Sequence, residues 1–221
     1  MKVHKHGERA GRTMGELSRK DREKAEHRLQ ILRAAEEVFA EEGFHGATMQ
    51  DIASRAEFSV GYLYGHFESK EGIFQRLVDL RAAEFIDGVQ ESIRADGEPL
   101  EKVRGVIAAK LDFFRRRQRF FLIFTHALTE QRAPGHPPLS QETHRRYGQY
   151  LTDLAAVFAE GVRRRVFVAQ DPMTMAVCVE GITNATIGHW VETGGAEGGA
   201  APTEVIQRLF LNGVLAEAGE R

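Results

Sequence analysis

Cysteine is almost absent from this chain of 221 residues, and so are the long apolar runs that a membrane span requires. The single cysteine, Cys178, cannot form an intrachain disulfide, which fits a reducing cytoplasm. No run reaches the roughly eighteen apolar residues of a transmembrane helix. The first 24 residues contain no apolar core of the kind that a secretory signal has. We therefore expect a cytoplasmic protein that does not contact a membrane.

The patterns of metal, cofactor and catalytic sites are also missing. Of the nine histidines, His136 and His144 flank an expected loop, and no carboxylate or cysteine follows at three or four residues to complete a ligand cluster. The glycine-rich segment 194–202, GGAEGGAAP, follows no strand and has no Lys-Ser/Thr after it, unlike a phosphate-binding loop. No nucleophile–base pair stands out. The sequence thus predicts no metal, no cofactor and no enzymatic activity.

The net charge of −2 hides an uneven distribution. Residues 1–33 carry ten Lys/Arg and five Asp/Glu, a charge of +5, so the remainder carries −7. A basic end on an acidic body suggests an anionic partner near the N-terminus. Residues 1–20 are interpreted as a flexible basic arm, and a solvated tail without a partner would have the same composition.

Helical spacing dominates the apolar pattern, and no segment alternates long enough to predict a strand. One stripe ends at Phe39, and Gly43 follows where a C-terminal helix glycine belongs. We divide the chain into the arm, a three-helix domain at 21–67 and a larger helical domain at 68–221. The fold class is all-α, with nine helices near 21–42, 48–55, 59–65, 69–94, 99–116, 118–131, 139–164, 172–192 and 203–218.

The segment TMQDIASRAEFSVGYLYGHF, residues 48–67, predicts two short helices joined by a tight turn. Thr48 can cap the first helix, with Asp51 completing a variant of the capping box. Ser59 can cap the second, whose Leu63 points inward. This pattern is a helix-turn-helix, which presents its second helix to the DNA major groove.

The exposed positions of the second helix are short or flat and can lie against base edges and the sugar–phosphate backbone. Lys70 lies in the first turn of the next helix, where free backbone N–H groups already favour an anion. An αα corner with surface tyrosines is the alternative interpretation. The exposed positions are Val60, Gly61, Tyr62, Tyr64 and His66.

Residues 28–75 resemble the DNA-binding domain of TetR/AcrR-type transcriptional repressors. That domain has an alanine-rich first helix, then G-[FY]-x-x-[AT]-[TS], an I-A motif, S-x-G-x-[LI]-Y-x-[HY]-F and S-K-E. The matching residues are Gly43, Phe44, Ala47, Thr48, Ile52, Ala53, Ser59, Gly61, Leu63, Tyr64, His66, Phe67, Ser69, Lys70 and Glu71.

The resemblance implies a DNA contact surface in which Ser59 caps the recognition helix. The phosphate contacts that it implies come from Thr48, Tyr64, His66 and Lys70. The base-edge contacts that it implies come from Gln50, Val60, Gly61 and Tyr62.

Two departures from the family pattern affect the expected surface. The usual Ala-Gly-Val-Ser turn is here Ala56-Glu57-Phe58-Ser59. If Glu57 must adopt a positive φ, the cost is roughly 1 kcal/mol relative to glycine. Tyr62 stands where a threonine or a smaller residue is common, so the operator sequence cannot be inferred from relatives.

The larger domain is expected to hold an apolar, aromatic-lined pocket with a few polar groups, as small-molecule sites do. A filled core built from the same aromatic residues is the alternative. Family resemblance favours the pocket, since such proteins usually bind an effector in this domain. The expected ligand-binding residues are Phe113, Phe121, Phe124, Thr125, His126, Tyr147, Asn184 and Trp190.

The last two helices are expected to form a homodimer interface. Gly181, Ala185 and Gly188 place small residues on one side of the expected helix 172–192, and the last helix carries an apolar stripe. Two helices from each chain would then close a four-helix bundle with two-fold symmetry. Packing of the last helix within its own chain is the alternative interpretation.

The predicted function is a repressor that releases a palindromic operator when a hydrophobic small molecule binds. The alternative is a DNA-binding regulatory or architectural protein with a filled core. The apolar stripe of the last helix, which is expected in the dimer interface, comprises Val205, Ile206, Leu209, Phe210 and Gly213.

Overall fold

The computed structural model describes residues 18–120, 123, 140–194 and 202–215. Within these ranges the elements are helical, as the apolar spacing predicts. The expected sixth helix, 118–131, falls largely outside the described residues, and so do most of residues 1–20. The described helices are α1 (Arg19–Gly46), α2 (Met49–Arg55), α3 (Val60–Tyr64), α4 (Lys70–Arg94), α5 (Pro99–Arg116), α7 (Gln141–Arg163), α8 (Pro172–Glu192) and α9 (Thr203–Val214).

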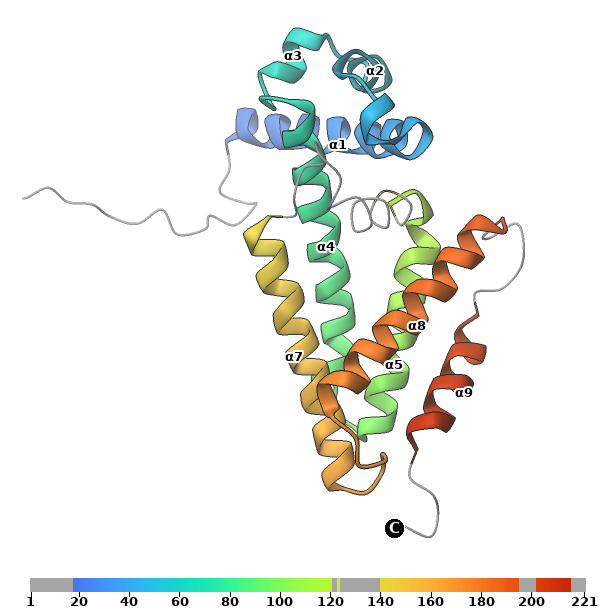
Figure 1. The fold of residues 1–221 in the computed structure, drawn as a ribbon. Helices are drawn as coiled ribbons and strands as arrows, with labels where there is room; N and C mark the ends of the chain where they lie inside the picture. Colours follow the sequence, from blue (N-terminus) through green and yellow to red (C-terminus); the bar gives the residue numbers. More distant parts are fainter. Residues whose placement is uncertain (1–17, 121–122, 124–139, 195–201, 216–221) are drawn as a thin grey trace, which may run out of the picture.

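The first three helices form a compact head at one end of the molecule, where α2 and α3 lie beyond α1 (Figure 1). Local capping explains where the short helices begin. The Thr48 hydroxyl accepts the backbone N–H of Asp51, whose carboxylate accepts the Thr48 backbone N–H, so the predicted capping box is confirmed. Ser59 caps α3 by accepting the backbone N–H of Tyr62. The inward prediction for Leu63 is also confirmed, since that side chain is buried.

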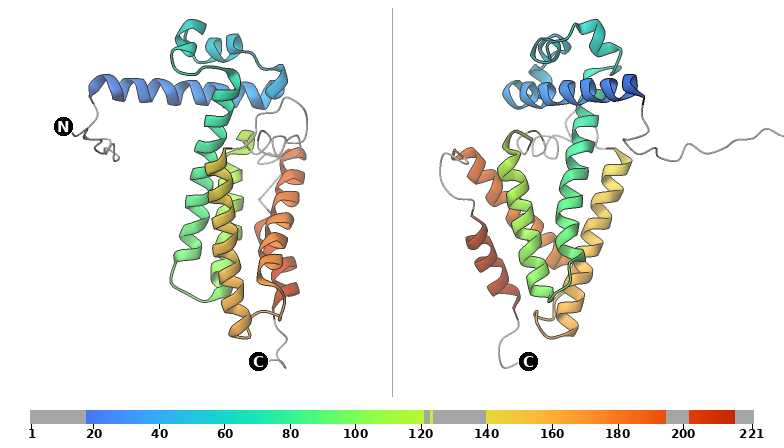
Figure 2. Two further views of the ribbon diagram at one scale, coloured as in Figure 1. Left: turned by 60° about the vertical axis from the view of Figure 1, so that its left-hand side comes forward. Right: turned by 180° about the vertical axis from the view of Figure 1, so that it is seen from behind.

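The body consists of α4, α5, α7, α8 and α9, and α4 extends from it into the head (Figure 1). Helix α4 packs against α1 at one end and against α5 and α7 along its length. Helix α8 packs on α7 and α5, while α9 lies at the outer edge beside α5 and α8 (Figure 2). A single apolar cluster continues from the head into the body. The head and the body are therefore joined through α4.

The end of α9 differs from the prediction of a helix at 203–218. Helix α9 ends at Val214, because Leu215 is extended and forms an isolated antiparallel bridge with Phe167. The Val168 N–H donates to the Val214 carbonyl at 2.8 Å. Phe167 itself is seated against Gly161, where any Cβ would lie 2.1 Å from its ring. The connection after α7 therefore determines where α9 stops.

No described helix has the length and apolar character needed to cross a bilayer. Among the same residues, no group of three or more His, Cys, Asp or Glu side chains is placed to hold a metal ion.

Candidate nucleic-acid interface

Helix α3 presents two tyrosines at the end of the head. Tyr64 is 55% exposed and Tyr62 is 38% exposed. Gly61 is also exposed, with open space where a side chain would begin, whereas Val60 is half-buried against the core. The surface therefore offers phenolic hydroxyls beside bare backbone, which suits contact with a groove of DNA.

Tyr62 is held by a small aromatic cluster that the sequence did not predict. The His27 Nδ1 and the Tyr62 hydroxyl are hydrogen-bonded at 2.7 Å. The Tyr62 ring stacks on Phe58 at 4.8 Å between centroids and lies 4.7 Å from the His66 ring. His27 comes from α1, 35 residues earlier in the chain. Helix α1 therefore takes part in orienting a side chain of the recognition helix.

The His66 side chain is half-buried, although the sequence analysis expected it at an exposed position. Its Nδ1 is buried and has no hydrogen-bond partner among the described residues. Burial, together with the positive groups Arg28 and Lys24, holds the pKa of His66 below its ordinary value. Arg28 also donates to the His66 carbonyl at 3.0 Å. Neutral His66 can contribute at most a hydrogen bond through its other ring nitrogen, rather than a full positive charge.

The remaining predicted contacts on the head have mixed surroundings. Gln50 on α2 is exposed. The hydroxyls of Thr48 and Ser59 are exposed, but both already serve as helix caps. The Thr48 hydroxyl also donates to the Asp51 carboxylate, so it can only accept a further bond, whereas the O–H of Ser59 can still donate one.

Lys70 is used inside the head. Its ammonium donates to the carbonyls of Phe44 and Ala47, at 2.7 Å each. It also lies 4.6 Å from the centroid of the Phe44 ring. These carbonyls follow Gly43, whose φ of 70° turns the chain at the end of α1. Two of the three ammonium protons of Lys70 thus stabilise the fold, and one remains for a phosphate.

The turn between α2 and α3 contains a residue with a positive φ. The sequence left the conformation of Glu57 open, and the structure gives it a φ of 59°. The Phe58 N–H donates to the Ala53 carbonyl at 3.0 Å and closes the turn.

The expected effector residues are only partly described. Phe121, Phe124, Thr125 and His126 lie outside the described residues. Phe113, Tyr147, Asn184 and Trp190 are half-buried in the body. The Trp190 Nε1 is buried without a hydrogen-bond partner among the described residues.

The polar group that Tyr147 contacts was missed by the sequence analysis. Its hydroxyl donates to Glu180 Oε2 at 2.9 Å, and the Tyr150 hydroxyl donates to Glu180 Oε1 at 2.8 Å. Lys110 Nζ lies 2.7 Å from Glu180 Oε2. A signal was present, because Lys110 interrupts the apolar stripe of α5 and Glu180 interrupts the apolar run MAVCVEG. A charged residue inside a helix's apolar stripe needs a partner.

This polar cluster is deeply buried, with Lys110 1% and Glu180 6% exposed. Burial opposes ionisation of Glu180, but the Lys110 ammonium and both tyrosine hydroxyls outweigh it and lower the pKa of Glu180. Burial and the neighbouring carboxylate raise the pKa values of Tyr147 and Tyr150. Burial lowers the pKa of Lys110, against the influence of Glu180. Because the ammonium is in contact with the carboxylate, we treat the two as an ion pair.

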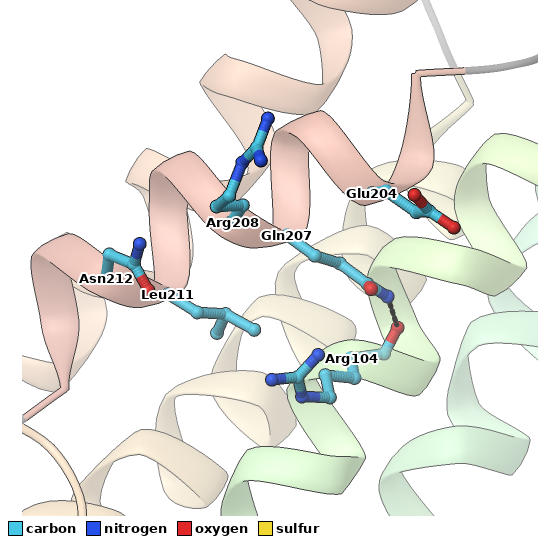
Figure 3. A pocket seen from close by; sticks show the side chains of 6 residues that line it. All are labelled: Arg104, Glu204, Gln207, Arg208, Leu211 and Asn212. Atoms are coloured by element: carbon cyan, nitrogen blue, oxygen red, sulfur yellow. Dashed lines mark hydrogen bonds between the residues drawn. The ribbon is translucent and has the colours of Figure 1, made fainter.

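Three hollows on the described surface lie elsewhere. Figure 3 shows one of about 220 Å³ between α5 and α9, where the Gln207 side chain donates to the Arg104 carbonyl at 3.1 Å. Its lining is mostly charged and polar. Two others, of about 240 and 360 Å³, lie along α4 and α7. None of these three is lined by Phe113, Tyr147, Asn184 or Trp190, so the predicted pocket stays a prediction.

Ion pairs connect the head to the body. Arg81 on α4 is buried and bonds Glu36 of α1, with Nε and Nη2 at 3.0 and 2.5 Å from one carboxylate oxygen. The same guanidinium donates to Glu84 at 2.9 Å. Glu84 also accepts from Arg117, just beyond α5, at 3.2 Å. A continuous charged chain thus runs from α1 through α4 to the end of α5.

Comparison with known proteins places this geometry in context. Residues 31–77 match the family model described as bacterial regulatory proteins, tetR family. The transcriptional activator FasR of Mycolicibacterium smegmatis is 35% identical over 100 residues, which cover 45% of this chain and 46% of that protein. The chain therefore spans about half the length of this relative. A fatty acid metabolism regulator protein of Bacillus subtilis is 24% identical over 187 residues, covering 84% of this chain and 94% of its own.

Solved structures share the fold. The transcriptional regulator FadR of Bacillus subtilis, solved in complex with stearoyl-CoA, has a TM-score of 0.66 and 22% identity. The superposition covers 84% of this chain and 98% of that one. The printed names are those of a transcriptional activator, a fatty acid metabolism regulator and a transcriptional regulator, and none of them names an enzyme.

Proposed function

The chain belongs to the TetR family of bacterial regulatory proteins, and on that premise we propose that it is a DNA-binding transcriptional regulator acting as a homodimer. The observation that carries the proposal is the head, in which the helix-turn-helix exposes Tyr62 and Tyr64 of α3. The first turns of α1 add exposed cations at Arg19, Lys20 and Arg22. Cations of this kind attract the phosphate backbone, while α3 enters the major groove.

The proposed contacts divide by chemistry. Gln50, Gly61 and Tyr62 face base edges, because an amide, bare backbone and a phenol can approach them closely. Val60 is the weaker member of this group, since it is half-buried. The phosphate contacts proposed come from Thr48, Ser59, Tyr64, His66 and the remaining ammonium proton of Lys70.

The proposed dimer interface is the outer face of α8 and α9. Four of the seven large apolar residues exposed in the described structure lie on these two helices. On α8 the face continues through Gly181 and Ala185, two exposed residues with little or no side chain. Phe210 was expected on this face, but it is 9% exposed and packs inward. The four exposed residues are Met173, Val177, Val205 and Leu209.

Regulation by a hydrophobic small molecule in the body forms the second part of the proposal. The names of the relatives, a fatty acid metabolism regulator and a stearoyl-CoA complex, favour an acyl compound. Repression relieved by this effector is the mode proposed, and a filled core without an effector is the alternative. A hundredfold loss of operator affinity needs roughly 2.7 kcal/mol of differential binding, within the usual range of allosteric coupling.

The ion pairs between head and body supply a path for this response. Because Arg81 holds Glu36 of α1 in a buried contact, a tilt of α4 carries α1 with it. Arg117, just beyond the end of α5, forms an ion pair with Glu84, so a shift of this end of α5 also moves the charged chain of contacts. Displacing the two heads would spoil the half-site spacing of about 34–36 Å that a dimer needs.

The test is selection of bound duplexes from a randomised pool, followed by affinity measurement at fixed salt. Wild-type protein is expected to select a palindrome, and Tyr62→Ala to change the preferred bases. Leu209→Glu should give monomers in ultracentrifugation and lose the palindromic site, since one head cannot bridge two half-sites. Thr152→Glu, at an exposed position of α7, is the matched control and should remain dimeric. A dimeric Leu209→Glu protein would contradict the interface, and selection of no sequence would contradict the regulator.

A further inference from the structure

The polar cluster around Glu180 contains more hydrogen-bond donors than its acceptor oxygens can accept. Both tyrosine hydroxyls are satisfied by the Glu180 carboxylate. The Lys110 ammonium carries three N–H groups, and the one acceptor in contact with it is Glu180 Oε2 at 2.7 Å. At least two donors of a side chain that is 1% exposed therefore have no acceptor among the described residues.

The charge of the cluster, in contrast, is already balanced. One ammonium faces one carboxylate, and the two neighbouring phenols are neutral because their pKa values are raised. A further anion would bring an uncompensated charge into the body, and a further cation would compete with Lys110 for Glu180. Burying an unpaired charge is far more costly than burying a neutral group. The missing partner is therefore an uncharged acceptor.

The surroundings of the cluster are apolar, and two of the aromatic side chains beside it are half-buried rather than fully buried. Lys110 Nζ lies 5.9 Å from the centroid of Phe85, which in turn contacts Phe113 and Tyr150. Phe113 and Tyr147 are only half-buried, although each adjoins the buried group. A chain-like apolar ligand entering beside these two rings would bring its polar end to Lys110.

We propose that Lys110, held by Glu180, Tyr147 and Tyr150, hydrogen-bonds an uncharged carbonyl oxygen of an apolar effector, such as that of an ester, thioester or ketone. This inference rests on the effector response proposed above and specifies its chemistry. Glu180 and Tyr150 are positioning residues, since Glu180 orients the ammonium and the Tyr150 hydroxyl holds Glu180, whereas the Tyr147 ring also flanks the entry of the ligand. The site thereby distinguishes an acyl ester from the corresponding free fatty acid, although the two share the same chain.

The experiment compares four probes that share a twelve-carbon chain: methyl dodecanoate, dodecanoate, dodecane and dodecyltrimethylammonium. Binding is followed at pH 8 by the fluorescence of Trp190, the single tryptophan, and confirmed by equilibrium dialysis. Wild-type protein is expected to bind the ester about 10- to 100-fold more tightly than dodecane, as a hydrogen bond from a charged donor predicts. Dodecanoate and the cation are expected to bind more weakly than the ester. Equal binding of ester and dodecane would show that water satisfies Lys110 and would overturn the proposal, as would preference for either ion.

The variant Lys110→Met/Glu180→Gln removes both charges together, so no unpaired charge is left in the core. It should bind dodecane as wild type does, yet lose the preference for the ester. With a ¹³C-labelled ester, the carbonyl stretch should shift to lower frequency on binding to wild type but not to this variant. Unchanged ester affinity or an unchanged shift in the variant would refute the contact. Glu142→Gln/Arg145→Met, which neutralises an exposed ion pair on α7, is the control and should behave as wild type.

The outcomes separate the two proposals. Wild-type protein that selects a palindromic duplex but does not prefer the ester refutes the carbonyl site and leaves the DNA-binding proposal intact. Wild-type protein that prefers the ester but selects no duplex refutes the regulator and leaves the ligand site.

Discussion

The contact between α1 and the recognition helix predicts that His27 influences DNA binding through Tyr62. The two side chains are hydrogen-bonded at 2.7 Å, and both are reachable by solvent. A neutral hydrogen bond of this kind contributes about 0.5–1.5 kcal/mol. Tyr62→Phe keeps the stacking on Phe58 but removes the hydroxyl, so operator affinity should fall roughly 2- to 12-fold.

His27→Ala should weaken operator binding to a similar or smaller extent, because it frees the hydroxyl without removing it. The double variant is the decisive measurement. If His27 acts only by orienting the Tyr62 hydroxyl, adding His27→Ala to Tyr62→Phe should cause little further loss. His27→Gln should restore part of the affinity, since its amide can again bond the phenol.

The assay is fluorescence anisotropy with the selected operator and a scrambled duplex, at one salt concentration because phosphate contacts depend on salt. Circular dichroism melts of each variant check that the head remains folded. Penalties that simply multiply in the double variant would refute the coupling. So would an equal loss on the scrambled duplex, because Tyr62 would then not read bases.

Two further predictions concern backbone positions. Gly161→Ala places a Cβ 2.1 Å from the Phe167 ring and should lower the free energy of unfolding by about 2–4 kcal/mol, as overpacking and loss of a buried ring do. In Gly148→Ala, on the same helix, the added Cβ meets open space, so this variant should raise the free energy of unfolding by about 0.5–1 kcal/mol. Urea titrations measure both variants, and equal unfolding midpoints would contradict this account. Glu57→Gly relieves a φ of 59° and should stabilise the head by up to about 1 kcal/mol without altering base preference, and a decrease in stability would show that Glu57 is not strained.

Much of the head was predictable because its determinants are local. The capping residues Thr48 and Ser59 act on N–H groups within three residues, so their roles can be recognised in the sequence. The positive φ of Glu57 follows from the tight turn between two short helices. Of the expected effector residues, half lie outside the described residues, and the others are half-buried without lining a described hollow.

Rotation of a helix about its axis was harder to predict. Leu209 and Phe210 both belong to the apolar stripe of α9, yet Leu209 is 64% exposed and Phe210 is 9% exposed. Which of two neighbouring apolar residues packs inward depends on how α9 meets α5, α7 and α8. A wide apolar stripe is compatible with several such rotations.

Local pattern thus specified the helical class, the helix-turn-helix and its caps, since each depends on residues a few positions apart. The tertiary structure decided which distant groups meet. Lys110, Glu180 and Tyr150 come from three helices, and Lys70 reaches carbonyls 23 and 26 residues earlier in the chain. A buried charge in a sequence shows that a partner is needed but not which one, because the choice depends on the packing register of whole helices.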